Sequence, residues 1–109
     1  MADQAPPAIT EAEAEVMAAL WRRGPLSFAS LIEEVKTAQP WADATIKTLL
    51  NRLMHKGAVR SVKEDGRQRY HPAFDRDAWV RAEVDAFVGR LFDGDRAALS
   101  RFLEKTNAA

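Results

Sequence analysis

The clearest pattern in the chain is an apolar stripe at helical spacing over residues 43–59, DATIKTLLNRLMHKGAV. Its apolar residues are Ile46, Leu49, Leu50, Leu53 and Met54. This spacing predicts an amphipathic helix with one buried face. The other side carries Thr45, Lys47, Thr48, Asn51, Arg52 and His55, none of which is acidic. Most solvated helix faces in a chain with 29% charged residues would mix Glu with Lys, so this face indicates a specific use.

Two further helices are expected before this stretch. Thr10 and Glu13 form a T-x-x-E capping box, which predicts the start of the first helix, and the Gly-Pro pair at 24–25 predicts its end. Leu26 is expected to be extended, and Ser27 then caps the second helix. The chain therefore places two short helices directly before the stripe.

A β-hairpin is expected after the third helix, which Gly57 ends as a left-handed cap. Alternating Val59 and Val62 predict one short strand, residues 64–67 a Gly-containing turn, and residues 68–71 a second strand. The resulting order is typical of a winged helix-turn-helix domain. The expected fold class is mainly α with a small β-hairpin wing, followed by C-terminal dimerisation helices.

A second apolar stripe begins near residue 75 and is interrupted at residues 93–95, before a last short helix. The first three helices and the hairpin already supply one core, so this stripe needs another surface, and we expect a second copy of the chain there. The alternative is that the stripe folds back on its own domain. The residues expected in the dimer interface are Trp79, Val80, Val84, Phe87, Val88, Leu91 and Phe102.

The domain organisation predicted from these patterns has three parts. Residues 1–8 are expected to be a disordered tail, residues 9–73 the winged-helix DNA-binding domain, and residues 74–109 the C-terminal helical dimerisation region. A chain of 109 residues fits one small domain with such an appendage. Because it has no Cys, disulfides and thiolate metal sites are excluded, and the composition fits a reducing cytoplasm.

The charge of the chain is zero overall but unevenly distributed. Residues 41–71 hold seven Lys or Arg against three Asp or Glu, so this block carries +4, whereas residues 1–40 carry −3 and residues 72–109 carry −1. The basic block contains the third helix and the wing. A local basic surface of this kind can bind phosphates even when the whole molecule is neutral.

Duplex DNA is the ligand that this combination favours. The second helix of a helix-turn-helix pair enters the major groove, where Asn and Arg pair with purine edges and Thr reaches bases or phosphates. Basic residues on the wing would lie against the backbone or in the minor groove. The predicted DNA-binding residues are Thr45, Lys47, Thr48, Asn51, Arg52, Lys56, Lys63, Arg67 and Arg69.

The chain resembles the penicillinase-repressor family, the BlaI/MecI/CopY type of winged-helix transcriptional regulator. The matching stretches are ITEAEAEVMAALWRRGP (9–25), ATIKTLLNRLMHKGAV (44–59), KEDGRQRYHP (63–72) and, more weakly, RLFDGDRAALSRFLE (90–104). The resemblance implies a cytoplasmic homodimer that binds a palindromic operator and represses transcription. It assigns the dimer-forming helices to residues 75–104. The recognition-helix and wing contacts that it implies are those named above other than Lys56.

Departures from the family pattern concern how the repressor would be released. Copper-responsive members have a Cys-rich tail, which this chain lacks. Members that respond to β-lactams are cut by a membrane sensor-protease at an Asn-Phe bond, and the corresponding pair here is Arg101-Phe102, where only the Phe matches. The chain also ends where relatives usually continue into another helix.

Other classes of function fit less well. His55 and His71 have no third partner at metal-ligand spacing, and the chain has no phosphate-binding or nucleophile-elbow motif, so we expect no enzyme, no cofactor and no metal site. It also has no apolar run long enough to span a membrane, so no membrane insertion is expected. The alternative of a different class is a winged-helix module that binds other proteins and no DNA.

Overall fold

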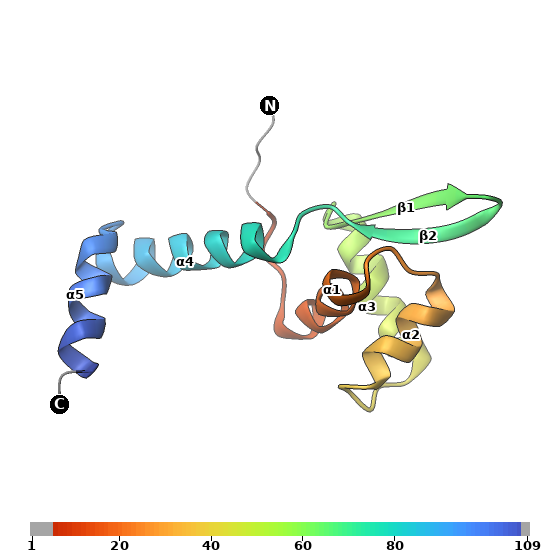
Figure 1. Cartoon of the computed structure of the whole chain (residues 1–109), viewed down its shortest axis with the longest axis horizontal. Helices are drawn as coiled ribbons and strands as arrows, with labels where there is room; N and C mark the ends of the chain where they lie inside the picture. Colours follow the sequence, from red (N-terminus) through yellow and green to blue (C-terminus); the bar gives the residue numbers. More distant parts are fainter. Residues whose placement is uncertain (1–5, 108–109) are drawn as a thin grey trace. The chain divides into compact units, whose positions relative to one another are not determined.

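The computed structural model describes residues 6–107, which form two compact units: one ends at Arg76 and the other begins at Asp77 (Figure 1). Three helices and a hairpin make up the first unit: α1 (Glu11–Arg23), α2 (Phe28–Lys36), α3 (Asp43–His55), β1 (Val59–Glu64) and β2 (Arg67–Pro72). α4 (Arg76–Phe92) and α5 (Arg96–Asn107) follow. This order confirms the predicted mainly helical fold with a β-hairpin wing.

Helix α1 is the central element of the first unit, because it packs against α2, α3 and β2. Its start is fixed by the predicted capping box: the Glu13 N–H donates to the Thr10 hydroxyl over 3.0 Å, and the Thr10 N–H donates to the Glu13 carboxylate over 2.8 Å. It ends at Gly24, whose φ of 84° favours glycine. Both predicted boundaries of this helix are therefore confirmed.

Helices α2 and α3 begin in different ways. Ser27 caps α2 by accepting a hydrogen bond from the Ser30 N–H over 3.2 Å, as predicted. Ala42 precedes α3 without a side-chain cap, and Asp43 in the first turn forms an ion pair with Lys36 over 2.5 Å. An acidic group at this end also interacts favourably with the helix dipole.

The core of the first unit is formed by one apolar cluster that draws on every element. The fully or nearly fully buried members from α1 to α3 include Val16, Met17, Leu20, Leu31, Val35, Ile46, Leu50 and Leu53. Trp21 lies at the edge of this cluster and donates its indole N–H to the Phe74 carbonyl over 2.8 Å. Trp41 also packs against the cluster, so both tryptophans lie at the rim of the core.

The hairpin is tied to the helices at its base. Asp65 and Gly66 both have positive φ, 52° and 76°, as a two-residue hairpin turn requires. Tyr70 in β2 also pairs with Leu26: the Tyr70 N–H donates to the Leu26 carbonyl over 2.8 Å, and the Leu26 N–H donates to the Tyr70 carbonyl over 3.2 Å. The predicted extended residue thus acts as a short third strand at the base of the wing.

The second unit consists of α4 and α5, joined by a tight turn. Asp93 and Gly94 adopt positive φ, and the Gly94 N–H donates to the Val88 carbonyl over 3.1 Å, which ends α4 as predicted. Asp85 of α4 and Arg96 of α5 form an ion pair. No helix in the described part of the chain is long and apolar enough to cross a membrane.

Candidate nucleic-acid interface

The predicted DNA-binding face of α3 is solvent-exposed along the whole helix. Burial of Ile46, Leu50 and Leu53 against α1 and α2 fixes the rotation of α3 about its axis, and the polar side is left outside. The exposed residues are Thr45, Lys47, Thr48, Asn51, Arg52 and His55. The structure therefore brings every predicted base-reading residue onto one surface.

A shallow hollow of about 390 Å³ lies over the C-terminal half of this face. Its lining residues are Thr48, Asn51, Arg52, His55 and Lys56. Hydroxyl, amide, guanidinium and imidazole groups converge there, so the hollow offers several donors and acceptors at once. His55 was predicted to lie on this face but was not among the predicted DNA contacts.

Lys56 differs from the other cations on this surface, because its ammonium group is already occupied. It lies 2.5 Å from the carboxylate of Glu13 and 3.1 Å from the carbonyl oxygen of Ala8. Glu13 is only 1% exposed. Burial raises the pKa of this carboxyl, but hydrogen bonds from Lys56 and Thr10 outweigh that effect and hold the pKa below its ordinary value.

The hairpin register divides the predicted wing cations between its two faces. Lys63 pairs with Gln68 and shares the face of Val59 and Tyr70, the face that meets the core. Arg67 and Arg69 lie on the opposite face. The sequence alone predicts all three cations as one group. The face on which each strand residue lies depends on the hairpin register, which the turn sets.

A carboxylate lies among the cations of the outer wing face. Glu64 is 3.6 Å from the Nε atom of Arg69 and 3.0 Å from the Nε2 atom of His71. Arg60 also lies on this face and is exposed, although it was not predicted as a contact. Within residues 6–107, five cations of α3 and the wing form no ion pair: Lys47, Arg52, Arg60, Lys63 and Arg67.

The comparisons with known proteins agree with this geometry. The family described as "Penicillinase repressor" matches residues 9–109. The chain belongs to the penicillinase-repressor family. It is 31% identical over 99 residues to the penicillinase repressor of Bacillus licheniformis, covering 90% of this chain and 77% of the relative. It is 34% identical to the transcriptional regulator BlaI of Mycobacterium tuberculosis, covering 88% and 72%.

Solved structures of the family confirm the winged-helix fold. The solution structure of monomeric Bacillus licheniformis BlaI in complex with the blaP half-operator is 34% identical, with a TM-score of 0.60, and the match covers 67% of this chain and 89% of that one. The DNA-binding domain of the repressor BlaI is 32% identical, with a TM-score of 0.58, covering 71% and 93%. The family assignment and fold therefore rest on sequence and structure together.

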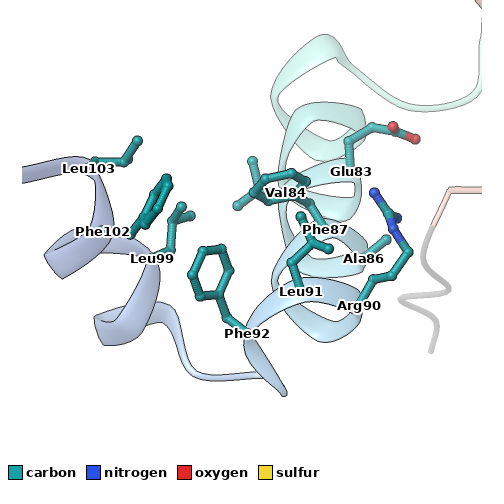
Figure 2. Close-up of a pocket in the computed structure, with 10 residues that line it drawn as sticks. All are labelled: Glu83, Val84, Ala86, Phe87, Arg90, Leu91, Phe92, Leu99, Phe102 and Leu103. Atoms are coloured by element: carbon teal, nitrogen blue, oxygen red, sulfur yellow. The ribbon is translucent and has the colours of Figure 1, made fainter. Parts of the chain in front are cut away.

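The second unit presents an apolar groove between its two helices (Figure 2). Its volume is about 610 Å³. Figure 2 shows side chains of both helices projecting into it: Val84, Phe87, Leu91 and Phe92 from α4, and Leu99, Phe102 and Leu103 from α5. Leu91 and Phe102 are 57% and 50% exposed, which is unusual for side chains of their size.

The predicted dimer residues do not all lie on this groove. Val84, Phe87, Leu91 and Phe102 line it, whereas Trp79 and Val80 are half-buried and lie outside it. Val88 is only 2% exposed in the single chain, so almost none of its surface is open to contact with a second copy. Helical spacing identifies apolar positions but does not separate those buried within a chain from those left at its surface. Leu103 was missed.

Proposed function

We propose that this chain is a sequence-specific, DNA-binding transcriptional repressor that acts as a homodimer on a palindromic operator. The observation that carries the proposal is the acid-free, exposed polar face of α3 beside a basic wing, in a member of the penicillinase-repressor family. The repressor relative whose structure contains a half-operator has the same winged-helix fold.

Helix α3 would read bases in the major groove. Asn51 can form two hydrogen bonds with an adenine edge, and Arg52 can do so with guanine. Thr45 and Thr48 can touch a thymine methyl or donate to a phosphate, and Lys47 supplies a charge at the rim. The exposure of all these groups means that none must leave a buried site before it contacts DNA.

The wing would hold the sugar-phosphate backbone. Arg67 and Arg69 project from its outer face, and Lys63 from the other, so the tip can meet phosphates on two sides. Such contacts fix the register of the protein on DNA and carry no sequence information of their own. Specificity would then come from α3 and much of the affinity from the wing.

The apolar groove between α4 and α5 is the surface that we assign to the second copy. Val84, Phe87 and Leu91 would pack there against the partner's equivalent helices and remove their exposed apolar area from water. A two-fold dimer places its recognition helices a whole number of DNA turns apart, so the target is an inverted repeat. The second half-site then binds at high effective concentration.

Release from DNA would involve the second unit. The pair that corresponds to the family's cleaved Asn-Phe bond is Arg101-Phe102, within α5, and its lack of the Asn argues against cleavage by the same kind of membrane sensor-protease. A bond inside a helix becomes accessible to a protease only when the helix opens locally. An operator-binding repressor works beside the chromosome, so the proposed function implies a cytoplasmic location.

Selection of bound duplexes from a random DNA pool, followed by sequencing, tests this proposal. An enriched inverted repeat with fixed spacing is the expected result. A single half-site without its mirror image would contradict the dimer but not DNA binding. No enrichment by folded protein would contradict DNA binding and favour a module that binds other proteins.

A further inference from the structure

The only acidic side chain of the buried core in the described residues connects two distant parts of the first unit. Glu13, in the first turn of α1, is 1% exposed and lies 2.5 Å from the Nζ atom of Lys56. Lys56 is the C-terminal cap residue of α3, the helix with the proposed base-reading face. One carboxylate thus joins the start of α1 to the end of α3.

The Glu13 carboxylate has two separate roles that a substitution can divide. Its Oε1 atom accepts hydrogen bonds from the Thr10 N–H, at 2.8 Å, and from the Lys56 ammonium, at 2.5 Å. The first bond closes the capping box, which Gln supports as well as Glu. The second bond needs the negative charge to be strong. Glu13→Gln therefore keeps the helix cap and removes the ion pair.

The Lys56 side chain is held from more than one direction. Its ammonium also donates to the Ala8 carbonyl over 3.1 Å, so both the segment before α1 and the first turn of α1 accept from it. Its backbone N–H donates to the Arg52 carbonyl over 3.0 Å, which places the anchored residue one turn from a base-reading side chain. Movement of the ammonium toward a phosphate would leave the buried Glu13 carboxylate without its cation and with only the Thr10 N–H as a donor, which is costly.

We propose that Glu13 is a positioning residue of the DNA-binding surface: by holding Lys56, it fixes the C-terminal end of α3 and thus the placement of Asn51 and Arg52. The inference rests on the proposed DNA-binding function. Lys56 then stays with Glu13 in the complex and is not a phosphate ligand, in contrast to the expectation from sequence. Loss of either partner disturbs the same helix end.

The test measures operator affinity over a range of salt concentrations for Glu13→Gln, Lys56→Met and the double variant. The matched control is Glu11→Gln, an exposed residue of the same first turn that changes the net charge equally. We expect each single variant to weaken operator binding by about tenfold, with no further loss in the double variant, because the two residues act as one unit. Lys56→Arg, which keeps the charge, should restore much of the binding.

The salt dependence separates positioning from direct contact. Loss of a phosphate contact lowers the slope of log affinity against log salt by about 0.9, whereas a positioning residue leaves the slope unchanged. Lys56→Met with a reduced slope, together with Glu13→Gln that binds as well as or better than the unaltered chain, would overturn the proposal. Unaltered binding by both single variants would overturn it as well.

A measurement without DNA separates a failure of this inference from a failure of the proposed function. Amide resonances of Arg52, His55 and Gly57 should shift in Glu13→Gln and Lys56→Met, and should stay in place in Glu11→Gln. Unshifted resonances would contradict the positioning role of Glu13, whether or not the chain binds DNA. Shifted resonances, in a chain whose unaltered form binds no duplex, would uphold the coupling of Glu13 to α3 and contradict the DNA-binding function.

Discussion

The carboxylate of Glu64 lies 3.6 Å from the guanidinium Nε atom of Arg69, on the wing face that also carries Arg67. The charge of Arg69, a proposed phosphate ligand, is therefore partly neutralised by a carboxylate of the adjacent strand before DNA binds. Both side chains are about two-fifths exposed, so the pair is a weak, surface-type ion pair that a phosphate can replace. This ion pair therefore reduces the electrostatic attraction between the wing and any polyanion.

Glu64→Gln should accordingly strengthen binding to duplex of any sequence. We expect an increase of up to about fivefold, because an exposed ion pair is worth no more than about 1 kcal/mol. Anisotropy titrations with operator and random duplex measure this, and the selectivity ratio should fall. Glu33→Gln, an exposed α2 residue with the same change in charge, serves as the control. Equal gains in both variants would point to net charge instead of release of Arg69.

Asn51→Ala and Arg52→Ala should each cost roughly 1–3 kcal/mol of operator binding and relax the sequence preference. Both side chains are exposed on α3, so the thermal midpoint of unfolding should change little. Competition between specific and random duplex gives the measurement. Equal losses on both duplexes would contradict a base-reading role for these residues.

Val84→Asp combined with Phe87→Asp should yield monomers that bind DNA weakly, since both residues line the exposed groove of the second unit. Val88→Asp should act differently: a charge at a 2% exposed position destabilises the helices themselves. Sedimentation and helical circular dichroism separate the two outcomes. A tight dimer in the Val84/Phe87 double variant would mean that the dimer interface lies elsewhere on the chain.

Acid should weaken the first unit through Glu13. Because its pKa in the folded chain is lowered below the ordinary 4.5, the stabilisation is fully present above that pH and is lost as the pH falls through the folded value. The Glu34 pKa is lowered too, by hydrogen bonds from Arg22 and Arg23. Thermal melts of Glu13→Gln and the unaltered chain should differ at pH 7 and converge in acid. Parallel curves would contradict this linkage.

Much of the fold could be predicted from local chemistry. The capping box at Thr10, the left-handed Gly57 and the turn at Asp65-Gly66 each depend on neighbouring residues, and the structure confirms all three. The buried face of α3 follows from the spacing of its apolar residues, so its exposed face could be predicted as well. The DNA contacts and the domain limits at residue 73 stay predictions.

What the sequence could not reveal depends on contacts between distant residues. Lys56 was grouped with the free cations because its partner Glu13 is 43 positions away. Lys63 and Arg69 lie on opposite faces of the wing because of the hairpin register. The burial of Val88 depends on how its helix packs, and the apolar residues of that helix are not confined to one stripe. Composition and periodicity contain no information about such pairings.

The bridge between Leu26 and Tyr70 has a mechanical consequence. Two backbone hydrogen bonds fasten β2 to the segment before α2, so the base of the wing must move with the helices. Beyond Tyr70, the described hydrogen bonds and ion pairs of residues 62–69 stay within the hairpin, so this segment forms a cantilever. Its tip can bend to follow backbones of differing groove width while its root stays aligned with α3. The stiffness and curvature of the duplex would then affect the energy needed to bend the wing. This effect would be separate from the bases that α3 contacts.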